Sequence, residues 1–291
     1  MTRKLGKWDV KELGLGAMPL SIEDRPERED AIALLHHALD LGINHIDTAY
    51  AYYLAGGTLE NGEEGHNEKL IAEALRTYSG DTTNVTVASK VGHFRYLDQN
   101  NQPMWGQQGC ARYILETAQQ SRDNLETDSI DLYYYHRPDL NVRYEESIGA
   151  LEKLLEDGVI KYAGISNASV EQIKYTQSVL GDKFIAVQNQ FSPGHISTLD
   201  TLEYTNEAGL TFLPWSPLGG FRNPELQSKD QPFEEVGEKY GVSKQQVILA
   251  WELAKGEHVV PIPGFRRNLT LEDSLKAIEL KLSEEDLQKL G

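Results

Sequence analysis

Strand-like and helix-like segments alternate along this chain about every 35 residues, and this regularity restricts its fold more than any other feature. The strand-like segments are short apolar runs rich in Ile, Val, Tyr and Leu, whereas the helix-like segments repeat apolar residues at helical spacing. The first clear helix is expected over 29–41, where Leu34 and Ala38 share one face. Gly42 follows it as an expected C′ residue. Such alternation is typical of βα units on a parallel sheet.

The number of cycles favours a closed barrel. The segments expected to form strands are 12–18, 43–49, 85–90, 130–136, 159–166, 184–189, 210–215 and 257–263. They predict an α/β fold of the (β/α)8 TIM-barrel type, as a single domain over 1–291. Residues 3–10 are expected to form one arm of an N-terminal β-hairpin that plugs the bottom of the barrel. A doubly wound parallel sheet is the competing topology.

Charge and cysteine content narrow the possible partners and the compartment. The formal net charge of −17 argues against a nucleic acid or an anionic membrane as a partner. No apolar stretch approaches the roughly 20 residues of a membrane span, and residues 1–10 lack the apolar core of a secretory signal. Cys110 is the only cysteine, which excludes an internal disulfide and fits a reducing cytosol. We therefore expect a cytoplasmic protein.

Four ionisable residues lie at the ends of three successive strand-like segments. Asp47 and Tyr52 close the second segment, Lys90 closes the third, and His136 closes the fourth. A parallel barrel gathers the carboxyl ends of its strands on one face, so we expect these side chains to lie close together. A carboxylate, a phenol, an ammonium group and an imidazole in one place form a proton-donating set. The set points to a reductase that needs no metal.

The remaining strand-like segments also end in groups that suit a ligand. The residues at or just after these ends are Ser166, Asn167, Gln188, Trp215, Ser216, Gly264, Arg266 and Arg267. Outside Arg3-Lys4, only Arg266-Arg267 places two basic residues side by side. Because the chain is strongly acidic, this pair is the expected place for an anionic group of a ligand.

Several motifs in order resemble the aldo-keto reductase superfamily, from near the N-terminus to the last helix, and are similar to its pyridoxal-reductase-like branches. They read DTAYAY, NEKLIAEAL, ASKVG, DLYYYHRPD, EDGVIKYAGISN, VQNQFSP, PWSPLGG and PIPGFRR. The resemblance implies an NAD(P)H-dependent reductase of a small-molecule aldehyde or ketone, with a monomer as the favoured state. Pyridoxal, small aldehydes and sugar aldehydes are all open as substrates. The loops at roughly 53–66, 92–109 and 217–232 would form the pocket walls.

The resemblance also implies a role for each residue of the proton-donating set. Tyr52 would be the general acid, and Lys90 would lower its pKa from the ordinary value of about 10. Asp47 would hold Lys90 protonated and in position. His136 would donate to, or orient, the carbonyl oxygen of the substrate.

A nicotinamide cofactor is implied on the same face. The residues that match the family's cofactor positions are Ser166, Asn167 and Gln188 for the carboxamide, Trp215 for the ring, Ser216, Leu218 and Gly219 for the pyrophosphate, and Gly264, Arg266, Arg267 and Asp273 for the adenosine end. Because the planar arginine fork binds two phosphate oxygens, a 2′-phosphate and hence NADPH is expected, with NADH as the alternative. Two departures are Phe265, where Thr, Ser or Ala is usual, and Asp273-Ser274, where a Glu-Asn pair is common.

Two other functions remain as alternatives. The first is a cofactor-binding regulatory subunit with weak reductase activity, because relatives that dock on ion channels often keep the four catalytic residues. The second is a short-chain-type dehydrogenase, because Tyr240 and Lys244 match Y-x-x-x-K. That pair must share one helix face, however, whereas Gly241 is expected to end one helix and Ser243 to begin the next.

Some neighbouring residues receive structural interpretations. His36 and His37 are expected to be structural, since no other ligand lies at metal spacing. Arg137 and Asp139 could contact the substrate or pair with each other, and pairing is the first expectation. Four aromatic residues after the second and third strand-like segments are candidates for the lining of the substrate pocket: Tyr53, Phe94, Tyr96 and Trp105.

Overall fold

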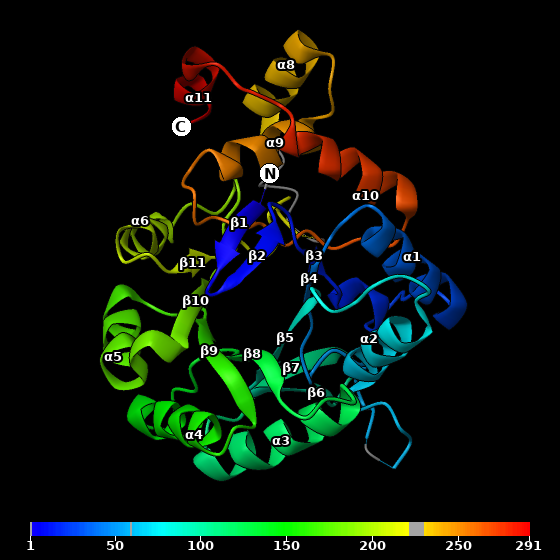
Figure 1. Ribbon diagram of the computed structural model, residues 1–291, viewed down its shortest axis with the longest axis vertical. Coiled ribbons are helices and arrows are strands. Elements are labelled where there is room, and N and C mark those ends of the chain that lie inside the picture. Colours follow the sequence, from blue (N-terminus) through cyan, green and yellow to red (C-terminus); the bar gives the residue numbers. More distant parts are fainter. Residues whose placement is uncertain (1, 59, 221–229) are drawn as a thin grey trace.

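The computed structural model describes residues 2–58, 60–220 and 230–291 (Figure 1). Seven parallel strands form one curled sheet in the order β11-β10-β9-β8-β5-β4-β3. Their bounds are β3 Leu15–Gly16, β4 His45–Asp47, β5 Thr86–Val91, β8 Ile130–Tyr135, β9 Ile160–Ser166, β10 Phe184–Gln188 and β11 Thr211–Phe212. Strands that follow one another in this series pair side by side, so the sheet winds in one direction as a barrel does.

An irregular segment, 258–264, closes the ring between the two outer strands. On one side, Val260 donates its N–H to the carbonyl of Phe212 at 2.9 Å. On the other side, the carbonyl of Pro263 accepts from the N–H of Gly16 at 3.0 Å. Because proline has no N–H, this segment can only accept hydrogen bonds from β3 at its proline positions, which explains its irregular ladder. The α/β fold of TIM-barrel type is confirmed.

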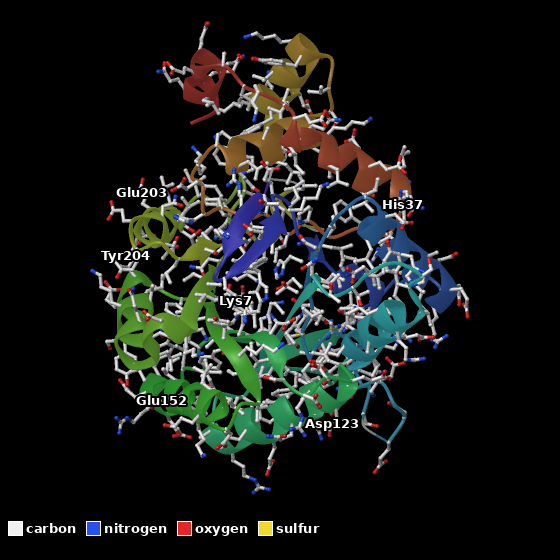
Figure 2. The ribbon with its side chains drawn as sticks, in the orientation of Figure 1. Lys7, His37, Asp123, Glu152, Glu203 and Tyr204 are labelled. Carbon is white, nitrogen blue, oxygen red and sulfur yellow. The ribbon has the colours of Figure 1, made fainter. Side chains whose placement is uncertain are left out.

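Helices surround the sheet, as Figure 1 shows. Their bounds are α1 Arg28–Asp40, α2 His66–Thr77, α3 Ala111–Asn124, α4 Tyr144–Glu156, α5 Val170–Leu180, α6 Leu199–Glu207, α8 Gln231–Tyr240, α9 Lys244–Leu253, α10 Asn268–Leu275 and α11 Glu284–Leu290, with the short 3-10 helices η1 Met18–Leu20, η2 Gly181–Lys183 and η4 Lys276–Ile278. Figure 2 places Asp123, Glu152 and Glu203 on the outer faces of their helices. Among the described residues, no helix has the length and apolar character to cross a membrane.

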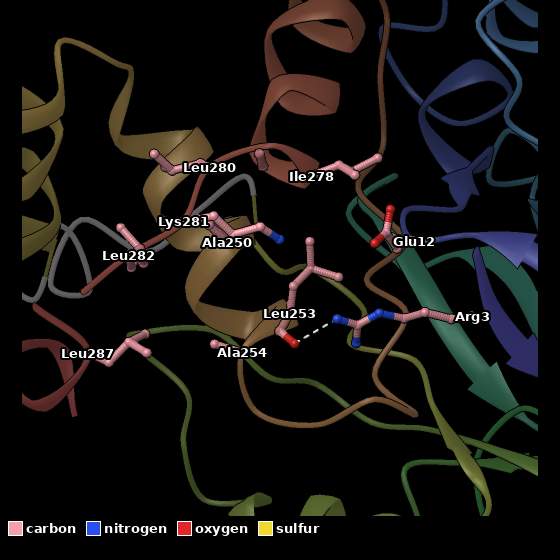
Figure 3. Close-up of a pocket in the computed structure, with 11 residues that line it drawn as sticks. Arg3, Glu12, Ala250, Leu253, Ala254, Ile278, Leu280, Lys281, Leu282 and Leu287 are labelled. Carbon is pink, nitrogen blue, oxygen red and sulfur yellow. Dashed lines mark hydrogen bonds between the residues drawn. The ribbon is translucent and has the colours of Figure 1, made fainter. Parts of the chain in front are cut away.

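An N-terminal hairpin plugs the amino end of the barrel, as expected, but residues 3–10 span both of its arms and not one. Its arms are β1 Thr2–Leu5 and β2 Trp8–Lys11, which pair antiparallel. Leu5 and Val10 are fully buried among the side chains inside the barrel. Arg3 donates to the carbonyl of Leu253 at 2.7 Å, beside a small cavity of about 160 Å³ (Figure 3). This cavity lies between the hairpin and the end of α9, at the opposite end of the strands from the expected chemistry.

The segment 92–109 differs from the expected loop, because most of it forms an antiparallel hairpin. Its arms are β6 His93–Leu97 and β7 Pro103–Gln107. The side chain of Asp98 accepts the backbone N–H groups of Asn100 and Gln102, each at 2.8 Å, and so builds the turn. The polar residues of this turn interrupt the alternation of apolar and polar residues in the two strands. The strands were therefore not predicted from the sequence. Residues 221–229 of the expected loop 217–232 lie outside the described residues.

The short-chain dehydrogenase alternative is excluded by the helix boundaries. Gly241 ends α8 in the left-handed conformation, with φ of 68°. The hydroxyl of Ser243 then accepts the N–H of Gln246 and begins α9. Tyr240 and Lys244 therefore lie on different helices and cannot form the acid pair of that family. His36 and His37 bond to Ala74 and Glu272, and the described part of the chain holds no cluster of metal ligands.

Candidate active site

Lys90 lies at the centre of the site that the strand ends form. It stands on β5, fully buried, and its Nζ donates three hydrogen bonds. They reach Oδ1 of Asp47 at 2.5 Å, the carbonyl of Thr48 at 2.7 Å and the hydroxyl of Tyr52 at 3.1 Å. All three protons of the ammonium group are thus directed at oxygen atoms. The charged form of the lysine is the one that this geometry stabilises.

Each oxygen of the Asp47 carboxylate accepts a hydrogen bond. Its Oδ1 binds Lys90, and its Oδ2 accepts from Nε2 of Gln188 at 2.7 Å. Burial by itself lowers the pKa of Lys90, but the nearby carboxylate and the phenol of Tyr52 raise it by more. The lysine therefore stays charged. Gln188, which was expected to bind the cofactor, also holds the carboxylate in place.

Tyr52 is a protonated phenol in this environment. Its burial raises the pKa above the ordinary value of 10.0, although the charge of Lys90 acts in the opposite direction. The expectation that Lys90 lowers the pKa is therefore right for the sign of the lysine's effect and wrong for the net result. The outcome suits a proton donor, because the acid form is fully populated near neutral pH.

His136 completes the expected set and has a histidine neighbour that sequence reasoning missed. Its ring meets that of Tyr52 edge to face, with 5.8 Å between centroids. The ring of His93, at the start of β6, lies 4.3 Å from that of His136, and the two ring planes are tilted by 32°. Burial lowers the pKa of His93 to about 3, and it lowers that of His136 well below 6.5. Both imidazoles are therefore neutral near pH 7 and can only donate a hydrogen bond through one nitrogen each.

The lowered pKa of His93 predicts an acid-sensitive stability. An unfolded histidine takes up a proton below about pH 6.5, whereas folded His93 does so only near 3. The unfolded state then binds more protons, so stability falls as the pH falls through this window. At pH 5, His93 should contribute a loss of about 2 kcal/mol relative to pH 7. Urea unfolding of wild type and His93→Asn at both values checks this; an equal pH effect in the two proteins contradicts it.

The new hairpin supplies an aromatic wall beside Tyr52. Trp105 of β7 lies edge to face against Tyr52, with 6.3 Å between ring centroids. Its cross-strand partner Arg95 places its guanidinium 4.1 Å from the centre of the indole ring, while Glu23 binds that guanidinium at 2.6 Å. Phe94 and other aromatic residues on the opposite hairpin face pack on each other instead. Trp105 therefore lies beside Tyr52 with Arg95 and Glu23 behind it, and its place in the lining of a substrate pocket stays a prediction.

Asn167, one of the expected carboxamide-binding residues, contacts the backbone of His136 and the side chain of Ser166. Asn167 adopts the left-handed conformation, with φ of 57°, which turns its side chain back toward the strand ends. Its Nδ2 donates to the carbonyl of His136 and to the hydroxyl of Ser166, each at 3.0 Å. Arg137 donates to its Oδ1 at 3.2 Å. Asp139 instead accepts the backbone N–H of Gly109, so the expected Arg137–Asp139 pair is wrong.

Trp215 and the residues after it form the next part of the rim. Trp215 is half-buried, and its Nε1 is buried without a hydrogen-bond partner in the described part of the chain. Ser216 has a φ of 49°, and its carbonyl accepts the N–H of Gly219 at 2.9 Å, which forms a tight turn. Leu218 packs against the core. Among the described residues other than its chain neighbours, no atom lies within 4 Å of the position that a Cβ of Gly219 would take.

The basic pair divides into one anchored and one exposed residue. Arg266 donates to the carbonyls of Pro19 and Glu23, at 3.2 and 2.8 Å. Arg267 precedes α10 and is exposed to solvent. Both arginines therefore follow the segment 258–264 that closes the barrel, and Arg267 exposes its guanidinium to solvent.

The other residues predicted at the adenosine end make structural contacts. Phe265 is buried in the core beside α1, and a Cβ on Gly264 would lie 2.7 Å from Cγ of Pro19. Both oxygens of Asp273 accept hydrogen bonds at 2.6 Å, from Ser243 and Gln246. The departure at Phe265 is thus explained by packing, and an adenine contact by Asp273 stays a prediction.

Comparison with known proteins agrees with this geometry. The sequence model of the aldo/keto reductase family matches residues 12–291. The chain is 30% identical to the probable aldo-keto reductase 1 of Glycine max, over 99% of this chain and 87% of that protein. It is 28% identical to the aldo-keto reductase yakc of Schizosaccharomyces pombe, whose name includes NADP(+), over 99% of this chain and 90% of that protein.

Solved structures give the same result. A thermostable aldo-keto reductase in complex with the inhibitor epalrestat superposes with a TM-score of 0.80 at 27% identity, covering 100% of this chain and 98% of that chain. The glycerol dehydrogenase of Gluconobacter oxydans has a TM-score of 0.83 at 23% identity, over 99% of this chain and 93% of that chain. At that lower identity the second likeness shows the shared fold.

Proposed function

This chain belongs to the aldo/keto reductase family, and from that premise we propose that it reduces an aldehyde or ketone with NADPH, using Tyr52 as the general acid. The family membership is consistent with NAD(P)H-dependent carbonyl reduction. One observation carries the residue assignment. The buried ammonium of Lys90 joins Tyr52, at 3.1 Å, to Asp47, at 2.5 Å.

The chemistry follows from what a carbonyl needs. Bound NADPH supplies a hydride to the carbonyl carbon, and the oxygen then develops negative charge. The phenol of Tyr52 would give its proton to this oxygen, and the charge of Lys90 would stabilise the phenolate left behind. The neutral imidazole of His136 would donate a hydrogen bond to the same oxygen. Asp47 keeps the lysine charged and in place.

The rim around Trp215 fits a nicotinamide cofactor. Trp215 is half-buried, and its Nε1 has no hydrogen-bond partner among the described residues. The hydroxyl of Ser166 and the amide of Asn167 would add polar groups at the same strand ends. Gln188, whose side chain contacts Asp47, would also contact the carboxamide of the cofactor. The turn after Ser216 would hold the pyrophosphate through backbone N–H groups. These residues would bind and orient the ring so that one face meets the substrate.

The basic pair supports NADPH over NADH. Arg267 is exposed beside the rim's last strand-like segment, and Arg266 follows Gly264 there. An arginine can bind two oxygens of a 2′-phosphate, and NADH has no such group. The NADP(+) in the name of the Schizosaccharomyces pombe relative agrees with this choice.

A direct assay tests the proposal. Purified protein is mixed with NADPH or NADH and a panel of aldehydes, and the loss of reduced cofactor is followed by absorbance. We expect turnover with at least one aldehyde class and a higher kcat/KM with NADPH. Absence of turnover with both cofactors across the panel would contradict the reductase assignment, whereas equal use of NADH would contradict only the cofactor choice.

A further inference from the structure

Arg137 is a cation at the site that the mechanism above does not use. It follows His136 directly at the end of β8, and its side chain is half-buried. Its Nη2 donates to Oδ1 of Asn167 at 3.2 Å, and its Nε is buried without a hydrogen-bond partner in the described part of the chain. The guanidinium therefore has one neutral partner for its five N–H groups.

The two other cations close to Tyr52 and Trp105 have carboxylate partners. Lys90 pairs with Asp47 at 2.5 Å, and Arg95 pairs with Glu23 at 2.6 Å. His93 and His136 are neutral near pH 7, as shown above. Beside Tyr52 and His136, Arg137 is therefore a cation with no carboxylate partner among the described residues, whereas Arg266 and Arg267 follow the barrel's closing segment.

Asp139, the nearest carboxylate along the chain, does not balance this charge. It is buried, and its oxygens accept the backbone N–H groups of Gly109 and Asn141, at 3.0 and 2.9 Å. Burial is also the sole cause that lowers the pKa of Arg137, as expected for a guanidinium without a carboxylate partner. A partly buried charge that lacks a counter-ion is costly for the folded protein. An anion from outside the chain would offset that cost.

We propose that Arg137 binds an anionic group of the substrate, so that the preferred substrates are aldehydes or ketones that carry a carboxylate or a phosphate. The inference rests on the proposed function, since Tyr52 and His136 fix where the carbonyl lies. His136 and Arg137 are consecutive, so one strand end would hold both ends of the substrate. The geometry favours an oxyanion because the guanidinium fork can bind two oxygens at once.

Equilibrium binding tests this without requiring turnover. The probes are para-carboxybenzaldehyde and its neutral counterpart para-formylbenzamide, titrated into the purified protein by calorimetry. The wild type should bind the carboxylate more tightly. Arg137→Met should weaken that binding by roughly 10- to 100-fold and leave the amide nearly unchanged. Arg143→Met, which removes an exposed arginine from the same connection between β8 and α4, is the matched control and should keep the preference.

A second pair of probes separates the two sources of the anion. Glyceraldehyde phosphate against glyceraldehyde reports on a phosphate, as the benzaldehyde pair reports on a carboxylate. The pair with the larger loss in Arg137→Met identifies the preferred anion. A positive result with either pair supports the anion site.

Two outcomes would overturn the inference. In one, the wild type binds charged and neutral probes equally. In the other, Arg137→Met weakens both members of a pair to the same extent, which would make Arg137 a residue that only positions Asn167. Neither outcome affects the reductase assignment, because that depends on cofactor oxidation with any aldehyde. Conversely, the protein could bind the charged probe more tightly than the neutral one and yet reduce no aldehyde. That result would contradict the proposed function and support the anion site.

Discussion

Tyr52→Phe is expected to lower kcat by about 10²- to 10⁴-fold, the usual contribution of a positioned general acid. Phenylalanine keeps the ring, so the edge-to-face contacts with Trp105 and His136 remain. Only the hydroxyl that Lys90 reaches at 3.1 Å is lost. The cofactor is expected to bind the rim around Trp215, so its dissociation constant should stay the same. Steady-state kinetics and a fluorescence titration with NADPH measure the two quantities.

Tyr50→Phe is the control for this experiment. Tyr50 lies two residues earlier, and its hydroxyl bonds to Glu64 and Gln120, at 2.5 and 2.6 Å, away from Lys90. This variant should keep most of the activity. Turnover by Tyr52→Phe at the wild-type rate would show that the proton comes from another group, and the assignment of Tyr52 would be wrong.

Of the variants proposed here, Lys90→Met is expected to cause the largest loss of stability. It should also remove activity. The variant leaves the carboxylate of Asp47, 2% exposed, with only the amide of Gln188 as a partner. Breaking a buried ion pair by removing one partner costs about 3–5 kcal/mol, because a buried charge is left uncompensated. Urea unfolding should therefore show a large drop in midpoint with an unchanged slope.

A second variant separates charge from packing. Lys90→Met combined with Asp47→Asn removes both charges and should recover much of the lost stability, while activity stays absent. If Lys90→Met is as stable as the wild type, its Asp47 carboxylate does not remain as a buried charge without a partner, and the prediction is wrong. If the double variant is no more stable than the single one, the loss comes from packing around the lysine side chain.

Several features of this molecule could be predicted from local sequence. The boundaries of α1 fall within one residue of the expected range 29–41, because apolar spacing and end signals lie within the segment itself. The meeting of Asp47, Tyr52, Lys90 and His136 could also be predicted, because each follows a strand of one parallel barrel. Their distances from one another could not be predicted.

Other features depend on residues that are far apart in sequence. His93 contacts Trp105, and Trp105 contacts Tyr52, because β6 and β7 pair. The polar turn at Asp98 made that pairing hard to predict from the sequence. Phe265 departs from the family pattern because it fills a core beside α1, which lies more than 200 residues away. No local signal in the sequence indicates either contact.

The sequence by itself determined the barrel, the strand ends and the residue types gathered there, because periodicity and strand position are local properties. Only the tertiary structure decided which charges are compensated. Asp47 forms an ion pair with Lys90, and Glu23 forms one with Arg95. Asp139 lies two residues from Arg137 but accepts hydrogen bonds from backbone N–H groups instead. The physical reason is that ion pairing and desolvation depend on distances of a few ångströms across the fold, which spacing along the chain does not specify.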